Sequence, residues 1–159
     1  MEMIFPCEIE FIRRDQWNEA MSLAWDTFLK FEARDYTSEG IFHFREFVTD
    51  ETLKKMFEAG MYPVIGAFYN GRMIGMISLR SGNHVSLLFV HEKYHRKGIG
   101  RRLVEKMATF VKEELNRDRI TVNAAPYGVP FYKKIGFVAT GLETRKDGIS
   151  YTPMEYYIG

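Results

Sequence analysis

The sequence has little cysteine, no long apolar run and almost no net charge. Its 159 residues include one cysteine, Cys7, which excludes an internal disulfide and fits a reducing compartment. No apolar stretch approaches the roughly 18 residues of a membrane span, and Glu2 and Glu8 interrupt the N-terminal segment, which argues against a signal peptide. Lys and Arg number 22 against 21 Asp and Glu, for a net charge of +1. We therefore expect a cytoplasmic protein with no membrane span and no nucleic-acid partner.

The hydrophobic pattern predicts mainly helices in the first part of the chain. Residues 8–13 alternate apolar and polar side chains, which is typical of a strand with one buried face. Apolar residues then recur at helical spacing, and candidate capping residues place helix starts near Asp15, Ser38 and Asp50. Gly60 ends the last of these helices.

The rest of the chain predicts a sheet with further helices. Asn70-Gly71 is a strong hairpin signal between two apolar strands. Residues 83–90 predict another strand, whose continuous apolar end suggests burial on both faces. The remaining predicted elements are a helix from Gly100, a strand over 120–124, a short helix over 126–135 and a hairpin turning at Asp147-Gly148. We expect a mixed α/β sheet in a single domain spanning residues 1–159.

The stretch HEKYHRKGIGR, residues 91–101, fits two different kinds of site. Its first half matches the zinc-protease pattern HExxH, which holds a metal between two histidines one helical turn apart. That site needs a helix, whereas the β-branched and apolar residues before it favour a strand ending at Val90. The extended motif also places a third histidine where Arg101 stands, and a guanidinium cannot ligate zinc. We therefore expect no metal, and a zinc hydrolase with Glu114 as third ligand stays an alternative.

The second half of the stretch, HRKGIGR, is typical of a loop that binds phosphate. Gly98 and Gly100 allow backbone N–H groups to turn toward one point, and the helix that follows directs its partial positive charge there. The basic side chains of the region are Arg96, Lys97, Arg101 and Arg102. A dinucleotide-binding site is excluded because the third glycine and the tight turn after the strand are missing. A plain helix start after a charged turn remains the alternative.

Two motifs together resemble the GNAT superfamily of acyl-CoA-dependent N-acetyltransferases. LLFVHEKYHRKGIGRRLV is similar to the family's Gln/Arg-x-x-Gly-x-Gly/Ala motif after an apolar strand, with His95 in place of the leading Gln or Arg. VNAAPYGVPFYKKIGF is similar to a second motif, an Asn on a strand followed by Phe-Tyr-x-x-x-Gly-Phe. The hairpin FYNGRMIGMISL matches the family's central strands, so the resemblance covers residues 63–137 and extends loosely to the last hairpin.

The resemblance implies a central, mostly antiparallel, twisted sheet, splayed at the acetyl-CoA site and flanked by helices. It implies helices that shape the acceptor site over residues 15–60, an acetyl-CoA-binding core over 63–137 and a C-terminal hairpin over 138–158. Acetyl-CoA would be the cosubstrate, with no metal. A homodimer is compatible with the resemblance.

The resemblance also implies which residues bind acetyl-CoA. They are Leu88, Phe89, Val90, His95, Arg96, Lys97, Gly98, Ile99, Gly100, Arg101, Asn123, Tyr132 and Lys134. The N–H of Leu88 would polarise the acetyl carbonyl, Val90 would bind the pantetheine amide, and the glycine loop would hold the pyrophosphate. Asn123 would bond the pantetheine arm or cap its strand, and Lys134 would reach the phosphates or stay solvated.

Two residues are candidates for moving protons. Tyr132 matches the family's general acid, and a phenol is a suitable donor to a departing thiolate. His84 lies four residues before Leu88, where histone-acetylating members carry a glutamate base, and an imidazole can accept a proton from an ammonium. An ordinary strand histidine fits the same position. The other candidates for the base are water, Glu32, Asp35 and Glu39.

The sequence does not specify the acceptor. Aromatic residues and carboxylates are mixed in the helices of residues 15–60, which suits a cationic amine but also fits helices with one face in a core. A small amine, a polyamine, an aminoglycoside, an amino acid and a protein lysine all stay open. We predict an N-acetyltransferase that moves acetyl from acetyl-CoA to a primary amine, with a non-catalytic acyl-CoA-binding module as the alternative.

Overall fold

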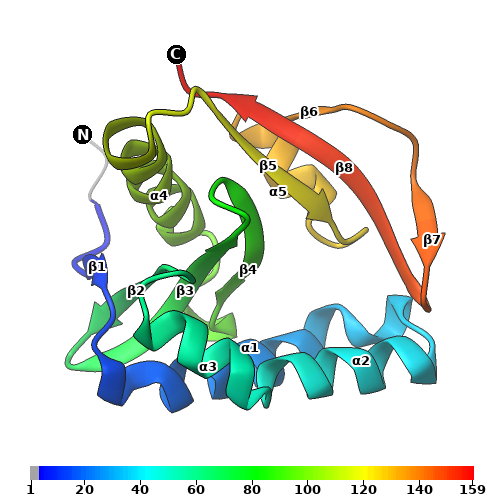
Figure 1. Ribbon diagram of the computed structural model, residues 1–159, viewed down its shortest axis with the longest axis horizontal. Coiled ribbons are helices and arrows are strands. Elements are labelled where there is room, and N and C mark those ends of the chain that lie inside the picture. The colour runs from blue at the N-terminus through cyan, green and yellow to red at the C-terminus, as the bar shows by residue number, and fades with distance from the viewer. Residues whose placement is uncertain (1–3) are drawn as a thin grey trace.

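The computed structural model of the protein describes residues 4–159 (Figure 1). Glu2, which entered the argument against a signal peptide, lies outside the described residues. The α-helices are α1 (Trp17–Phe31), α2 (Ser38–Val48), α3 (Glu51–Glu58), α4 (Ile99–Leu115) and α5 (Val129–Lys134). One-turn 3-10 helices lie at Arg14–Gln16, Ala33–Asp35 and Glu92–Tyr94.

The strands form one mixed sheet. They are β1 (Glu8–Phe11), β2 (Val64–Tyr69), β3 (Arg72–Arg80), β4 (His84–Val90), β5 (Arg119–Ala124), β6 (Val138–Ala139), β7 (Thr144–Lys146) and β8 (Ile149–Tyr157). Their order is β1-β2-β3-β4-β5-β8-β6, and β7 pairs with β8 outside this path. Within residues 4–159 every pairing is antiparallel except that of β4 with β5. This sheet, with its flanking helices, confirms the predicted fold class.

Helices cover both faces of the sheet and create two cores. One core packs α4 against the sheet around the fully buried Ile77, Leu103 and Met107. The other packs α1 to α3 on the opposite face, around Phe28 and Met76. Figure 1 shows these three helices side by side along one edge of the view, with α4 on the other side of the strands. The sheet is thus the middle of three layers.

Local signals explain several turns and helix starts. Asn70 and Gly71 have φ of 51° and 77°, the positive values that a tight two-residue hairpin turn requires. Asp50 caps α3 by accepting a hydrogen bond from the backbone N–H two residues later, at 2.8 Å. Thr37 caps α2 by accepting the N–H of Gly40 at 3.1 Å. These predictions of turns and helix starts are confirmed to within one residue.

Two predictions about the N-terminal region were wrong. α1 begins at Trp17, after a 3-10 turn, and Asp15 pairs with Arg13 at 3.1 Å instead of capping the helix. In β1, Ile9 is only half-buried and Phe11 is 46% exposed. The reason is that β1 is an edge strand that pairs only with β2, so little of its predicted apolar face is covered.

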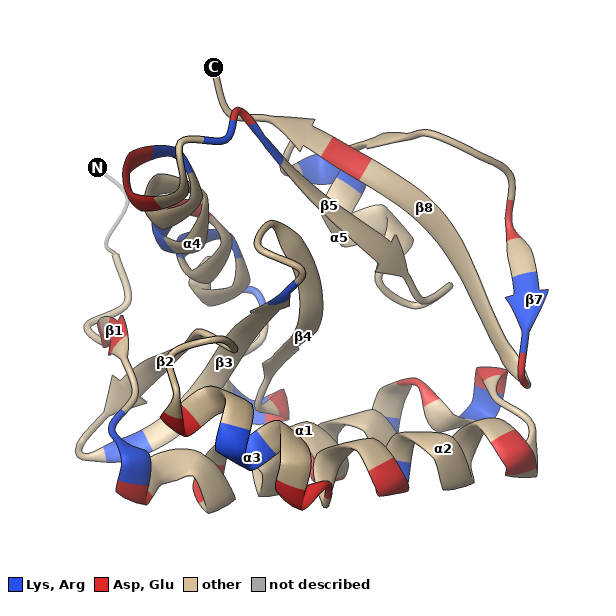
Figure 2. Cartoon of the chain, viewed as in Figure 1, with Lys and Arg blue, Asp and Glu red and all other residues tan. Residues whose placement is uncertain are grey.

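Charge is spread over the molecule without a dominant sign. Figure 2 shows both acidic and basic positions on the helices that flank the sheet, in keeping with the net charge of +1. In the part of the chain that the structure describes, no helix is both long enough and apolar enough to cross a bilayer.

Candidate active site

β4 and β5 pair over only two residues and then separate. The pairing is limited to His84 with Thr121 and Val85 with Val122. β4 continues to pair with β3 as far as Val90, and Figure 1 shows β4 and β5 diverging. The sheet is therefore splayed in its middle, beside the second half of β4.

A β-bulge lies where the two strands separate. The register between β3 and β4 shifts at Ser86, which is the extra residue on β4. Bulges bend a strand and are frequent beside active sites. The hydroxyl of Tyr62 donates to Ser86 Oγ at 2.8 Å and lies 2.7 Å from Ser78 Oγ. This buried hydrogen-bond pair fixes the bend that opens the sheet.

The backbone of β4 presents an open edge to the gap. Hydrogen-bonded and non-hydrogen-bonded pairs alternate along an antiparallel ladder. The N–H of His91 donates to the carbonyl of Ile74 at 2.8 Å. Phe89 therefore also faces β3, whereas Leu88 and Val90 direct their N–H and C=O groups away from it. No strand of residues 4–159 pairs with them on that side.

The side chains of β4 contradict the predicted burial on both faces. Val85, Leu87 and Phe89 are buried, whereas Leu88 and Val90 are only half-buried. The apolar run is continuous because the side chains on one face of β4 pack in the core, while Leu88 and Val90 on the other face line a cavity.

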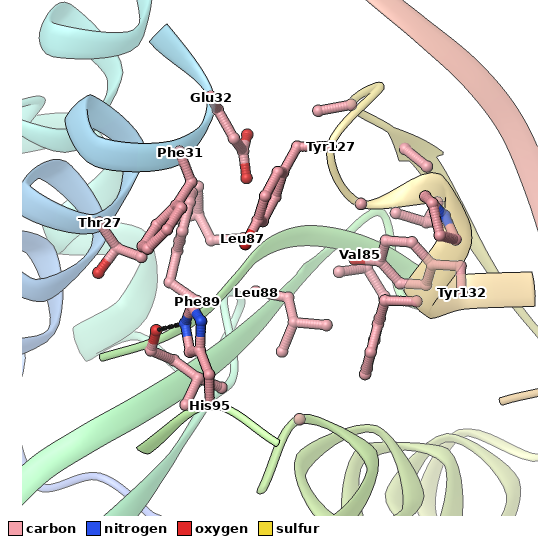
Figure 3. Close-up of a pocket in the computed structure, with 18 of the residues that line it drawn as sticks. Thr27, Phe31, Glu32, Val85, Leu87, Leu88, Phe89, His95, Tyr127 and Tyr132 are labelled. Atoms are coloured by element: carbon pink, nitrogen blue, oxygen red, sulfur yellow. Dashed lines mark hydrogen bonds between the residues drawn. The ribbon is translucent and has the colours of Figure 1, made fainter. Parts of the chain in front are cut away.

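The splay opens into a cavity of about 960 Å³, a volume typical of small-molecule sites. The predicted binding residues that line it are Leu88, Phe89, Val90, His95, Arg96, Gly98, Ile99, Gly100, Arg101, Asn123, Tyr132 and Lys134. Lys97 is not among the lining residues, and its ammonium lies over the ring of Phe5, 5.5 Å from the centroid. Figure 3 shows side chains from α1, β4 and α5 converging on this space.

The loop before α4 offers a row of unpaired N–H groups to the cavity. Arg96 and Gly98 have φ of 62° and 78°, and such left-handed residues turn successive N–H groups toward one concave face. The N–H of Arg102 is the first that bonds back into the helix, to Gly98 at 3.1 Å. Within the described chain, the N–H groups of residues 96–101 find no backbone acceptor. With the positive end of α4, this row of N–H groups is suited to an anion, and residues 96–101 are called the anion-binding loop for this predicted role.

Gly100 has a different reason to be glycine. A Cβ atom at this position would lie 3.0 Å from two ring carbons of Phe131. The absence of a side chain thus allows α5 to pack against the first turn of α4. Both helices border the cavity, so this contact defines its shape.

Two basic residues of the motif make internal contacts. The guanidinium of Arg102 donates to the carbonyls of Phe5 and Cys7 at 2.8 and 2.9 Å, so the charge predicted to support the anion site is directed elsewhere. His95 Nε2 lies 2.7 Å from the carbonyl oxygen of Val90, and its ring is 5.0 Å from that of Phe31 (Figure 3). The side chain that departs from the family motif therefore ties the loop to the open edge of β4.

The zinc pattern does not form the helix that it needs. Residues Glu92–Tyr94 form one 3-10 turn between β4 and the anion-binding loop. His91 Nδ1 accepts the N–H of Lys93 at 3.1 Å, while His95 contacts Val90. The two histidines thus belong to separate local hydrogen bonds.

Tyr132 lies at the inner wall of the cavity. Its side chain is 7% exposed and packs between Phe131 and Phe137, with ring centroids 5.2 and 5.1 Å away. Burial, and then the negative charge of Glu32, raise the pKa of the Tyr132 phenol above its ordinary value. The hydroxyl therefore stays protonated at neutral pH, and the same shift makes it a weaker acid than a solvated phenol.

Glu32, which the sequence offered only as one of three alternative carboxylate bases, lines the cavity. It follows the last residue of α1, and Figure 3 shows its carboxylate directed into the cavity between Phe31 and Tyr127. Burial, and then the charge of Asp35, raise the pKa of Glu32 to about 7. In the sequence it was one of several carboxylates among aromatic residues, and nothing local separated it from Glu39.

His84 does not line this cavity, although Val85 beside it does, and its role as the base stays a prediction. Its Nδ1 is 2.8 Å from Thr121 Oγ1, in the paired part of β4 and β5, and it is not among the lining residues. Burial, and then the positive charge of Arg80, lower the pKa of His84 to about 4. An imidazole with so low a pKa is a poor proton acceptor.

Comparisons with known proteins agree with this geometry. The family model described as an acetyltransferase (GNAT) domain matches residues 32–158. A GCN5-related N-acetyltransferase from Rhodopseudomonas palustris superposes with a TM-score of 0.83 at 19% identity, covering 99% of each chain. The PaiA N-acetyltransferase from Thermoplasma acidophilum, solved in complex with coenzyme A, gives 0.77 at 21% identity, covering 96% of this chain and 99% of that one. No curated protein matches the sequence.

The fold and the splayed cleft define the protein as an acetyltransferase. The chain belongs to the GNAT acetyltransferase family.

Proposed function

We propose that the protein is an N-acetyltransferase that moves the acetyl group of acetyl-CoA directly to a primary amine. The observation that carries the proposal is the open edge of β4, where Leu88 and Val90 face a cavity that also receives the anion-binding loop and Tyr132. The coenzyme A complex of the Thermoplasma neighbour supports this choice of cosubstrate.

The residues present fit acetyl-CoA by their chemistry. Pantetheine carries amide groups that can pair with a strand edge, and Val90 has an N–H directed into the gap. Asn123, at the end of β5 where the sheet opens, would bond the same arm from the opposite side. The N–H groups of residues 96–101 would hold the pyrophosphate, with Arg96, Arg101 and Lys134 around them.

Two groups of the chain would assist the transfer itself. The N–H of Leu88 would donate to the acetyl oxygen as negative charge develops there, and such a fixed donor stabilises an oxyanion strongly in a site with little water. Tyr132 O–H would give its proton to the departing thiolate, a role that its buried, protonated state allows. The amine must also lose a proton, and His84 is not our choice for this step because its side chain is not part of the cavity lining and burial lowers its pKa to about 4.

The test is acetyl-CoA turnover against a panel of amines, read by release of free thiol. We expect thiol release that requires both acetyl-CoA and an amine. Acetyl-CoA should also raise the melting temperature, because a ligand that binds only the folded state stabilises it by about 2.7 kcal/mol at a hundredfold excess over its Kd. Thermal stabilisation without thiol release from any amine would instead identify an acyl-CoA-binding module, and the absence of both would contradict the proposal.

We also propose that residues 1–159 act as one catalytic domain in the cytoplasm. The matched region covers residues 32–158, and α1, which precedes it, packs in the same core as α2 and α3. Cys7 is a free, buried thiol that contacts Arg102 through its sulfur at 3.2 Å, which suits a reducing compartment.

A further inference from the structure

We propose that Glu32 anchors the acceptor as an ammonium ion and accepts its proton, so that the acceptor is a cationic primary amine with an apolar chain or ring next to the nitrogen. The proposal rests on the proposed function and adds the missing base and the substrate class. It is carried by the place of one carboxylate among aromatic rings, inside the cavity that holds the open edge of β4.

The backbone places the Glu32 side chain firmly. Its N–H completes the last turn of α1 by donating to the carbonyl of Phe28 at 2.9 Å. Directly after it, the 3-10 turn Ala33–Asp35 reverses the chain. The carboxylate is thereby held at the end of a helix and directed into the cavity, beside the stacked rings of Phe31 and Tyr127 (Figure 3).

No cation of the protein neutralises this carboxylate. Within residues 4–159, Glu32 forms no ion pair and its side chain accepts no hydrogen bond. The lysine nearest in sequence, Lys30, is paired with Glu92 at 2.6 Å instead. The Glu32 side chain is half-buried and its oxygens still meet solvent in the open cavity, so the unpartnered carboxylate is only partly solvated in the free protein. A ligand cation would supply the missing partner, which is what an ammonium-binding site requires.

The groups around Glu32 favour a cation over an anion. Asp35 adds negative charge from the adjacent turn, and Tyr36, Tyr127 and Tyr132 line the same space. Burial raises the pKa of Tyr36 and of Tyr132, so these two phenols are neutral. The basic groups that line the cavity are His95, Arg96, Arg101 and Lys134, and none of them is paired with Glu32. The cavity thus has an acidic, aromatic end formed by the chain after α1 and a basic end at the start of α4.

Aromatic rings define what lies next to the ammonium. Phe31 stacks on Tyr127 with centroids 5.2 Å apart, and Phe28 meets Tyr36 edge-on at 4.8 Å. Phe31, Tyr36, Phe44 and Tyr127 all line the cavity. Ring faces attract cations and pack against apolar groups. A short alkyl or aromatic amine matches this lining better than a polyhydroxylated one, which would need more polar partners.

The protons balance with Glu32 in this role. The carboxylate takes one proton from the ammonium, and the freed lone pair forms the new C–N bond as the C–S bond breaks. Tyr132 gives its proton to the thiolate, and the second proton lost by nitrogen restores the Tyr132 phenol through solvent. Glu32 then releases its proton to water, so that one proton leaves per amide formed. With a pKa of about 7, Glu32 can both accept and release a proton near neutral pH.

The test compares Glu32→Gln with wild type and with Glu39→Gln, a matched change at an exposed glutamate of α2 that does not line the cavity and is therefore no longer a candidate base. Benzylamine, n-butylamine and the neutral benzyl alcohol are the probes. At pH 8 with saturating coenzyme A, both amines should raise the melting temperature of wild type and of Glu39→Gln, and benzyl alcohol should not. Glu32→Gln should lose the response to the amines and keep its stabilisation by acetyl-CoA, which also shows that it folds.

Kinetics provide the second measurement. In wild type, kcat/KM for benzylamine should rise with pH through an apparent pKa near 7. Glu32→Gln should lower kcat/KM by about 10² or more and remove that limb, leaving only the titration of the amine. An amine-dependent melting shift or a pH limb that survives in Glu32→Gln overturns the inference, as does a wild type that no amine stabilises. Stabilisation by amines through Glu32 without thiol release would contradict the proposed function and leave the ammonium site standing.

Discussion

At the scale of single residues, burial gives two acidic groups opposite roles. The low polarity of the cavity wall disfavours the charged form of any acid. For the Tyr132 phenol this raises a pKa that is already high, so the group stays protonated at every physiological pH. For Glu32 the same effect brings the pKa to about 7, where the group exchanges protons readily. Two residues in similarly buried environments can therefore suit the two proposed proton transfers, with Glu32 at the amine and Tyr132 at the thiolate.

Replacing Tyr132 by Phe tests the donor. The change keeps the ring between Phe131 and Phe137 and removes only the O–H. We expect acetyl-CoA affinity within a few-fold of wild type and kcat lower by about 10² or more, since a positioned acid has roughly that effect. Tyr156→Phe is the control, because Tyr156 packs on the same Phe137 ring but does not line the main cavity. Near-normal turnover in Tyr132→Phe would remove the acid from the mechanism.

Glu32 should also leave a mark on stability in the absence of any ligand. Its pKa rises from 4.5 to about 7 on folding, so the folded state holds the proton more tightly than the unfolded state. The stability that this proton provides is present at low pH and lost as pH rises through about 7. Glu32→Gln cannot lose it, and we expect the variant to be more stable than wild type at pH 8, by on the order of 1–3 kcal/mol, and nearly equal at pH 4.5.

Urea unfolding at the two pH values measures this difference. Glu39→Gln, at an exposed position of α2, should not show the gain at pH 8. A Glu32→Gln protein with no advantage at pH 8 would mean that the Glu32 carboxylate is better solvated in the free protein than its place in the cavity implies.

At the scale of elements, local chemistry predicted most of the fold. The hairpin at Asn70-Gly71 needs two positive φ angles, and the Asp50 cap needs one short acidic side chain, so both could be read from a few residues. The glycine loop before α4 was predictable for the same reason. β6 lies inside the hairpin predicted over residues 138–158 but was not predicted as a separate strand, because two residues that bond only to β8 carry no periodicity of their own.

Tertiary context decided the rest of the site. The apolar run of β4 reads the same whether its second face meets a helix or a cavity, so the exposure of Leu88 and Val90 could not be predicted. Glu32 and Glu39 have similar sequence surroundings, but only Glu32 lines the cavity. It does so because the end of α1 packs beside Tyr127, which comes more than 90 residues later in the chain. His84 shares a strand with Leu88, but the strands part only after Val85, which leaves His84 on the paired side.

The first turn of α4 offers a prediction about cosubstrate binding. Gly100→Glu would place a carboxylate beside the N–H groups of residues 96–101 and press its Cβ against Phe131. Because a negative charge there repels pyrophosphate, we expect the thermal stabilisation by acetyl-CoA to disappear. Lys106→Glu, a larger change of charge on the exposed face of the same helix, should keep it. Equal acetyl-CoA responses in both variants would contradict the assignment of this loop to phosphate.

At the scale of the whole molecule, the two halves of the sheet are joined at both ends of the cleft. At one end, β4 and β5 share a two-residue pairing. At the other, the tip of the β7–β8 hairpin reaches the start of α2, as Figure 1 shows on the right of the view. There the N–H of Thr37 donates to the carbonyl of Gly148 at 3.1 Å. The hairpin thereby connects the last part of the chain to the helices that bear the acceptor end of the cavity.

This contact depends on the lack of a side chain at Gly40. A Cβ atom there would lie 2.5 Å from the carbonyl oxygen of Gly148, closer than packed atoms allow. We expect Gly40→Ala to displace the hairpin tip from α2 and to destabilise the protein by about 1–3 kcal/mol, as overpacking commonly does. Hydrogen exchange should accelerate over residues 144–151 and leave the strands β2 to β4 protected. Ser38→Ala, which adds no atoms at an exposed position of the same helix, should change neither quantity. Unchanged exchange at residues 144–151 in Gly40→Ala would show that the hairpin holds its place without α2, so that the cleft is closed at one end only.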